Sequence, residues 1–118
     1  MTTTTIQPTE LPATIRAYLA AHQADETDEA ARKFAKTAVI VDDGHIFRGT
    51  DGVRDFLEKA SSEYTFTTTL VGARRIDDSH WVAINRVEGN FPGGVVVLSY
   101  DFILEEDLIS ELTISPQT

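Results

Sequence analysis

The sequence of 118 residues predicts one α+β domain, in which a curved antiparallel sheet packs over three N-terminal helices. In the first half of the chain the apolar residues recur at helical spacing, whereas from Tyr64 onward they alternate with a period of two. Helices followed by a run of strands are typical of α+β proteins and not of alternating βαβ proteins. A chain of this length also has room for one modest core.

We expect residues 1–9 to be a flexible leader and residues 10–118 to form the single domain. The leader is rich in threonine and has neither the basic region nor the apolar stretch of a secretory signal. No run approaches the roughly 18 apolar residues that a membrane span needs. These features predict a cytoplasmic protein that does not interact with membranes.

Three helices are expected in the first half. The first covers about residues 10–24, with Pro12 in its first turn, where proline is tolerated. The second covers about 27–36 and is capped by Thr27. The third begins after Gly49, with Thr50 or Asp51 as its cap. Their apolar stripes are Leu11, Ile15, Tyr18, Leu19 and His22, then Ala30, Ala31, Phe34 and Ala35, and finally Val53, Phe56, Leu57 and Ala60.

Strands are predicted from residue 39 onward. Residues 39–42 and 45–48 form a hairpin around Asp43 and Gly44, a dipeptide suited to positive φ angles. Four longer strands follow at about 64–76, 80–91, 94–105 and 108–115, with turn residues between them. Consecutive antiparallel strands of this kind form a meander that can curl over the helices.

The strand at 94–105 has two apolar faces. Val97, Ser99, Asp101 and Ile103 share one face, and Val96, Leu98, Tyr100, Phe102 and Leu104 share the other. A monomer rarely exposes so large an apolar patch. We therefore expect one face to cover the helices and the other to meet a second copy in a homodimer.

Charge and composition exclude several functions. A net charge of -9 disfavours nucleic acid and anionic membranes as partners. The absence of cysteine removes disulfides, thiolate zinc sites and thiol nucleophiles. The histidines at 22, 45 and 80 lack metal-ligand spacing, and there is no glycine-rich phosphate loop, so we expect no metal and no cofactor.

Asp101 is the most unusual residue of the strand-rich half, because a carboxylate rarely lies among apolar neighbours without a partner. If it faces a pocket, its pKa should rise, and the neutral acid can donate a hydrogen bond to a carbonyl oxygen. Alternatively it bonds a side chain of a neighbouring strand or leans into solvent. The residues alone leave both interpretations open.

Other candidate site residues are Tyr18, on the apolar stripe of the first helix, and Asp42, which shares strand parity with Ile40. Tyr18 is either a pocket donor or a core aromatic. Asp42 is a candidate general base, with Asp43 assigned to the turn. The candidate ligand contacts are Asn85, Trp81, Phe56 and Ser99; Asn85 lies either in the pocket or in a pair across the sheet.

The order of these elements resembles the nuclear transport factor 2-like superfamily, which includes ketosteroid isomerases and SnoaL-like polyketide cyclases. The resemblance covers about residues 10–115 and rests on four segments. These are IRAYLAA at 15–21, FAKTAVIVD at 34–42, GTDGVRDF at 49–56 and VVLSYDF at 96–102. It implies a cone-shaped sheet wrapped around the helices and enclosing one apolar pocket.

The resemblance also implies roles for three residues. The isomerases form an oxyanion hole from a tyrosine of the first helix and an aspartate of a late strand. Tyr18 matches that tyrosine and Asp101 matches that aspartate. Asp42 matches the aspartate that serves as their base. The implied function is a cofactor-independent isomerase, cyclase or dehydratase acting on a small apolar carbonyl compound. The alternative is a dimeric domain of the same fold that binds a small molecule, or serves a structural role, without catalysis.

Overall fold

The computed structural model describes residues 3–24, 26–63 and 66–116, and within them it has an α+β fold with one seven-stranded mixed sheet. The predicted fold class is therefore confirmed. The helical elements are η1 (Pro8–Glu10, a 3-10 turn), α1 (Ala13–Gln23), α2 (Thr27–Ala31) and α3 (Gly49–Glu63). The strands are β1 (Thr4–Ile6), β2 (Phe34–Asp42), β3 (His45–Arg48), β4 (Phe66–Arg75), β5 (His80–Gly89), β6 (Val95–Glu105) and β7 (Leu108–Pro116).

The strand order is β1-β4-β5-β6-β7-β2-β3. Strands β4 to β7 form the predicted antiparallel meander, and the hairpin of β2 and β3 is also antiparallel. The expectation of a wholly antiparallel sheet is wrong at one place, because β2 pairs with β7 in parallel. Between them the chain passes through β3, α3 and the other meander strands, so no hairpin forces the two to run in opposite directions.

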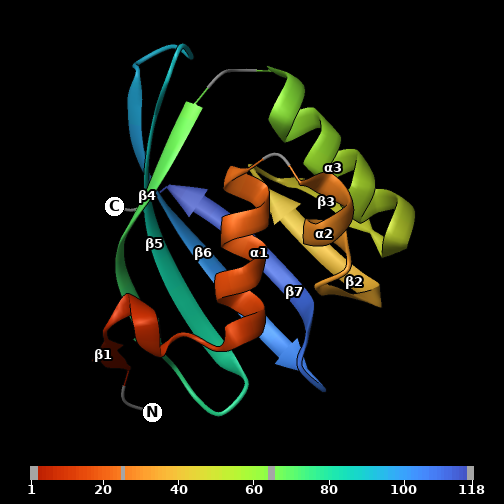
Figure 1. Ribbon diagram of the computed structural model, residues 1–118, viewed down its shortest axis with the longest axis vertical. Helices are drawn as coiled ribbons and strands as arrows, with labels where there is room; N and C mark the ends of the chain where they lie inside the picture. The colour runs from red at the N-terminus through yellow and green to blue at the C-terminus, as the bar shows by residue number, and fades with distance from the viewer. Residues whose placement is uncertain (1–2, 25, 64–65, 117–118) are drawn as a thin grey trace.

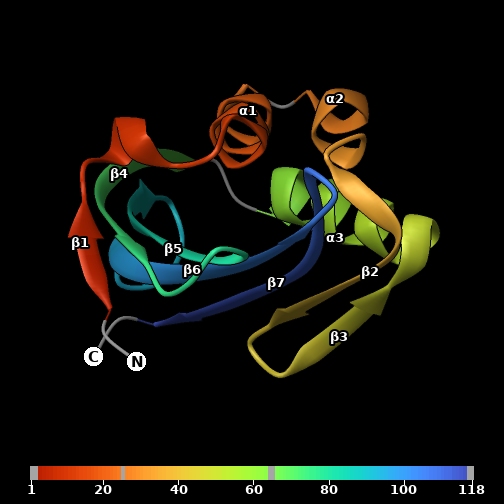
Figure 2. The ribbon, with the colours of Figure 1, turned by 90° about the horizontal axis from the view of Figure 1, so that it is seen from below.

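The sheet is curved, and the three α-helices lie on one side of it, inside the curve (Figures 1 and 2). The inner face of the sheet carries Tyr100 and Phe102 from β6 and packs against the helices; the outer face carries Ser99 and Asp101. The completely buried side chains include Ile15, Tyr18, Ala38, Ile40, Phe102, Ile109 and Leu112. Burial of this apolar surface holds helices and sheet together at roughly 25 cal/mol for each Å² removed from water.

The second helix is shorter than predicted. It ends at Ala31, and Phe34 and Ala35 belong to strand β2, not to the buried face of the helix. Phe34 pairs with Ile109 of β7, and the amide of Ile109 donates to the carbonyl of Lys33 over 2.8 Å. Pairing with a strand distant in the sequence overrides the local helical preference of these residues.

The expected flexible leader at residues 1–9 contains ordered elements. Strand β1 pairs with β4, with Thr4 opposite Arg75 and Ile6 opposite Ala73, and η1 follows at once. Ile6 packs against the core, which gives this short edge strand an apolar anchor. The leader is therefore corrected to an edge strand and a turn in its described part.

Some expectations concern residues outside the described part of the chain. One is the side chain of Ala60, which was expected on the apolar stripe of α3. Another is the first two residues of the strand expected at 64–76. Among the described helices, none combines the length and the apolar character that a membrane span requires.

Candidate functional site

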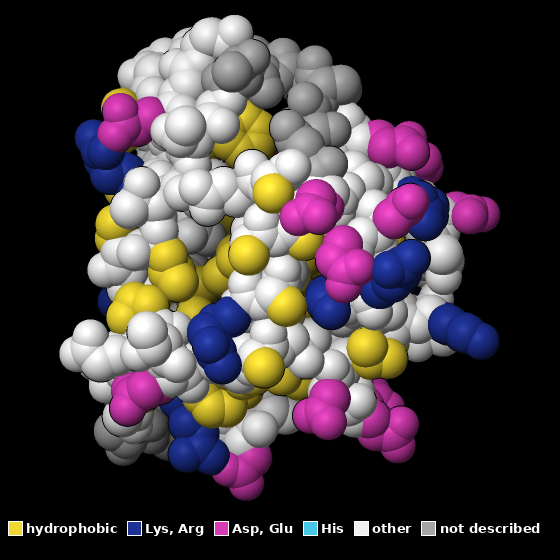
Figure 3. All heavy atoms as spheres, in the orientation of Figure 1, with side chains coloured by type: hydrophobic (Ala, Val, Ile, Leu, Met, Phe, Trp, Pro, Cys, Tyr) yellow, Lys and Arg dark blue, Asp and Glu magenta, His cyan; other side chains and the backbone are white. Residues whose placement is uncertain are grey.

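Two adjoining cavities open between α1 and the inner face of the sheet, and they share the wall residues His22 and Tyr100. Their volumes are about 260 Å³ and about 250 Å³. Figure 3 shows apolar side chains gathered along the side of α1 that faces the strands. Because the cavities share a wall, we treat them as two parts of one candidate site.

The two cavities differ in chemistry. The first cavity is rich in hydrogen-bond donors, and its described lining contains one cationic side chain and no carboxylate. The residues of that lining are Pro8, Thr9, Arg16, Leu19, Ala20, His22, Gln23, Thr68, Leu70, Asn85 and Tyr100. The second is apolar except for three residues; it is lined by His22, Asp42, Phe56, Phe66, Val87, Phe91, Val96, Leu98, Tyr100 and Ile114. An apolar cavity with a few polar groups is the usual form of a small-molecule site.

Asp42 is the acid of the second cavity. It is the last residue of β2, and it lies on the same face of the strand as the fully buried Ile40. Asp43 and Gly44 follow with φ angles of 51° and 79°, the left-handed conformations that a two-residue hairpin requires. The turn therefore directs Asp42 to the cavity and leaves Asp43 exposed, as the alternation of the strand predicted.

Tyr100 stands between the two cavities. Burial raises the pKa of its hydroxyl, and the negative charge of Asp42 raises it further. The hydroxyl therefore stays protonated at neutral pH and acts as a hydrogen-bond donor. In the sequence, Tyr100 lies on an apolar face of its strand, and that pattern alone indicated no chemical role for it.

Tyr18 lies behind the cavities, completely buried, and it is absent from the described lining of both. Its ring stacks on His22 with centroids 5.7 Å apart and meets Phe34 and Phe102 edge to face. Its hydroxyl is buried and has no hydrogen-bond partner in the described part of the chain. Burial, then the neighbouring Tyr100 and Asp42, raise the pKa of this hydroxyl.

His22 is a site residue that sequence analysis assigned to a structural role. It follows Tyr18 by one helical turn on the same apolar stripe, which places it on the inward side of α1. Its ring lies 6.3 Å from the rings of Phe56 and of Phe66, and it lines both cavities. A histidine continuing an apolar stripe was the signal that could have found it.

Asp101 is not in the candidate site. It alternates with the buried Tyr100 and Phe102, so it lies on the outer face, and its side chain is 42% exposed. The expectation that Asp101 and Ser99 face the pocket is therefore corrected. The hydroxyl of Ser99, on the same strand, donates to the carboxylate of Asp101 over 3.2 Å. The outward, partly exposed position of Asp101 corresponds to the alternative in which it leans into solvent.

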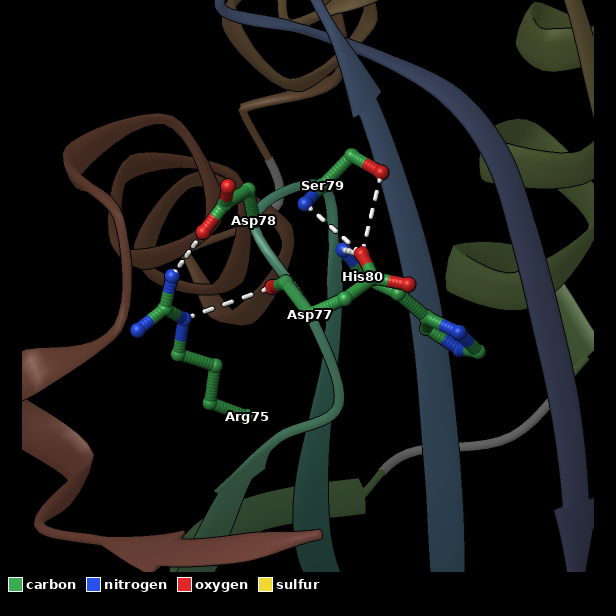
Figure 4. A network of polar contacts seen from close by, with 5 residues as sticks. All are labelled: Arg75, Asp77, Asp78, Ser79 and His80. Atoms are coloured by element: carbon green, nitrogen blue, oxygen red, sulfur yellow. Dashed lines mark hydrogen bonds and ion pairs between the residues drawn. The ribbon is translucent and has the colours of Figure 1, made fainter. Parts of the chain in front are cut away.

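The second neighbour of Asp101 is His80, whose Nε2 lies 3.7 Å from its carboxylate. His80 begins β5, directly after a turn organised by Asp77 (Figure 4). The carboxylate of Asp77 accepts hydrogen bonds from the amides of Ser79 and His80, each over 2.9 Å. These bonds lower the pKa of Asp77 and fix where His80 enters the sheet.

The other predicted contacts divide between the site and its surroundings. Asn85 lines the first cavity and Phe56 the second. Trp81 packs against the core at the end of the inner face, where the guanidinium of Arg75 lies 5.3 Å from its ring. Within the described residues no group of three or more histidine, aspartate or glutamate side chains is placed to hold a metal ion.

Comparison with solved structures shows the same fold in other proteins. A "putative polyketide cyclase" from Sinorhizobium meliloti superposes with a TM-score of 0.87 and 25% identity, over 93% of this chain and 100% of that one. A protein with a ketosteroid isomerase-like fold from Catenulispora acidiphila, in complex with trimethylamine, gives 0.78 and 16%, over 88% and 85%. A nuclear transport factor 2-like protein of unknown function from Cytophaga hutchinsonii gives 0.72 and 12%, over 88% and 87%.

No family model matches the sequence, and none of the curated proteins does. The likeness is therefore carried by the three-dimensional structure.

Proposed function

The chain has the nuclear transport factor 2-like fold, and from that premise we propose that it is a cofactor-independent acid–base catalyst acting on a small apolar carbonyl compound. The reaction class is isomerisation, cyclisation or dehydration. One observation carries the proposal: a carboxylate, Asp42, and a protonated phenol, Tyr100, line the same apolar cavity. The names of the polyketide cyclase and ketosteroid isomerase-like neighbours support this class.

In the proposed mechanism, Asp42 removes a proton from the carbon next to the carbonyl group. The electron pair of that C–H bond moves toward the carbonyl and forms an enolate, whose oxygen accepts a hydrogen bond from Tyr100. Isomerisation is complete when Asp42 returns the proton to another carbon of the conjugated system. General acid–base catalysis of this kind contributes about 10²- to 10⁴-fold, and a donor aimed at the developing charge adds to it.

Tyr100 takes the place that sequence analysis gave to Asp101, because it is the inward residue of that part of β6. Tyr18 acts in this proposal as a positioning residue, since its ring supports His22 from behind and its hydroxyl is enclosed in the core. His22 forms the wall between the two cavities and limits where a substrate can lie.

The test is the exchange of the acidic C–H hydrogens of 2-tetralone in D2O, followed by NMR. We expect the protein to accelerate exchange above the buffer rate. Asp42→Asn should slow the accelerated reaction by at least about 100-fold, and Tyr100→Phe by about 10- to 100-fold. Asp43→Asn is the matched control, because its carboxylate lies in the turn, and it should exchange as the unaltered protein does.

Two outcomes would contradict the proposal. One is exchange at the buffer rate with 2-tetralone bound, which favours the second candidate, a domain that binds without transforming its ligand. The other is undiminished exchange by Asp42→Asn. The specific observation behind the second candidate is the buried Nδ2 of Asn85, which has no hydrogen-bond partner among the residues that the structure describes. Asn85 lines the first cavity, whose described lining does not include Asp42.

A further inference from the structure

Asn85 carries an unpartnered donor inside a cavity. The residue is 1% exposed, and its Nδ2 has no hydrogen-bond partner among the described residues. A buried amide without a partner costs free energy, so such groups are rare in folded proteins. Because Asn85 also lines the first cavity, a ligand that brings an oxygen acceptor there would satisfy the donor.

Arg16 adds a positive charge to the same cavity. It lies on α1, and its Nε donates to the carbonyl of Leu11 over 2.9 Å, which holds the guanidinium at the wall. The described partners of Arg16 involve Nε alone, so its terminal nitrogens remain for a ligand. The described lining of this cavity has no acid that would compete with an anionic ligand.

The second cavity has the opposite character. Aromatic and aliphatic side chains make most of its wall, and its one described acid, Asp42, would repel an anionic group. The shared residues His22 and Tyr100 join the two cavities, so one elongated molecule can occupy both. The charged end of such a molecule belongs beside Arg16 and the apolar body beside Asp42.

We propose that the first cavity is a carboxylate-binding subsite, in which Asn85 and Arg16 hold the acid end of a ligand whose apolar body fills the second cavity. The inference deepens the proposed function, and rests on it for the reaction, by naming the substrate class as apolar carboxylic acids that carry a carbonyl group. Binding of the acid itself is independent of catalysis.

The experiment compares 6-phenylhexanoate with its neutral isostere 6-phenylhexanamide by calorimetric titration. We expect the unaltered protein to bind the carboxylate about tenfold more tightly, because charged hydrogen bonds exceed neutral ones. Arg16→Met should reduce that preference to about twofold or less. Arg74→Met removes the same charge from the outer face, opposite Val82, and should keep the preference.

Asn85→Leu separates a binding role from a structural one. Its amide donates to an oxygen of either probe, so both should bind about tenfold more weakly. Removal of an unpartnered buried donor should at the same time leave the melting temperature equal or raise it. A lower melting temperature would indicate a structural role for this amide, and would contradict the binding role inferred for Asn85. If Asn85→Leu does not fold, Arg16→Met remains the test of the subsite.

Equal binding of the two probes by the unaltered protein would overturn the inference. A loss of the carboxylate preference in Arg74→Met as large as that in Arg16→Met would also overturn it, because only the net charge of the protein would then matter. Asp42→Asn should keep the preference while it loses the exchange of 2-tetralone. A carboxylate preference without exchange contradicts the proposed function alone, and exchange without a preference contradicts the subsite alone.

Discussion

Two tyrosine side chains, those of Tyr18 and Tyr100, are buried in this structure. The apolar surroundings disfavour tyrosinate, and the nearby carboxylate of Asp42 adds a like charge that disfavours it further. The same two causes make Tyr100 a dependable donor at neutral pH. They also link the site to the stability of the protein at high pH.

We expect the protein to lose stability above about pH 10. Since the folded-state pKa of each hydroxyl lies above its unfolded value of 10.0, its contribution to stability is complete below that pH and is lost as the pH rises. The free energy of unfolding should fall above pH 10 and fall less in the double variant Tyr18→Phe and Tyr100→Phe. Denaturant titrations at a series of pH values measure this.

Tyrosinate absorbance near 295 nm gives an independent readout. Of the three tyrosines in the chain, these two should ionise only as the protein unfolds. Ionisation of all three near pH 10 with the fold intact would show that Tyr18 and Tyr100 are accessible to water.

The start of α3, the helix that carries Phe56, packs against β3. Gly52 lies in the first turn of α3, and a Cβ there would approach the backbone carbonyl carbon of Phe47 to 2.9 Å. The ring of Phe47 in turn meets Phe56 edge to face, with centroids 5.5 Å apart. Phe56 lines the second cavity, so the close approach at Gly52 contributes to its position.

Gly52→Ala should therefore destabilise the protein by about 1–3 kcal/mol, since overpacking outweighs the roughly 1 kcal/mol that alanine gains in a helix. Chemical denaturation measures the loss, and weaker binding of 2-tetralone should accompany it as Phe56 moves. Asp55→Ala, at an exposed position of the same helix, should change stability by less than about 0.5 kcal/mol. A stabilising Gly52→Ala would mean that α3 and β3 separate readily.

At the scale of the whole molecule, the outer face of the sheet carries apolar side chains that the described helices do not cover. Val97 and Ile103 of β6 are half-buried on that face, and Ile46 is exposed at its edge. Val82 and Ile84 of β5 lie on the same face but are buried among their neighbours. Figure 2 shows the helices on the other side. Charged side chains of both signs accompany them, such as Arg86 paired with Glu88, and the carboxylate of Asp101 lies near His80.

We propose that two copies associate through this outer face. Light scattering should give a mass near twice 13.0 kDa at micromolar concentration. Val97→Lys, at the middle of the face, should shift the protein to monomer, because a buried unpaired charge opposes association. Leu108→Lys changes an exposed apolar residue at the turn between β6 and β7 and should leave the mass unchanged. A monomeric mass for the unaltered protein would contradict the proposal.

Much of the architecture was predictable from the sequence, because periodicity is a local property. The change of period near residue 64 predicted helices before strands, and the Asp43-Gly44 dipeptide predicted the hairpin. Parity along β2 placed Asp42 on the inward side with Ile40 and assigned Asp43 to the turn. These conclusions need only the spacing of neighbouring residues, so tertiary contacts did not change them.

Tertiary structure decided which face of β6 is inside. Alternation divides its residues into two sets, but both sets are rich in apolar side chains, and nothing in the strand itself says which one the helices cover. The curvature of the sheet and the packing of α1 turned Tyr100 inward and Asp101 outward. Three other features also depend on contacts between distant segments, which the local spacing of residues does not contain. They are the end of α2 at Ala31, the parallel pairing of β2 with β7, and the cavities at His22.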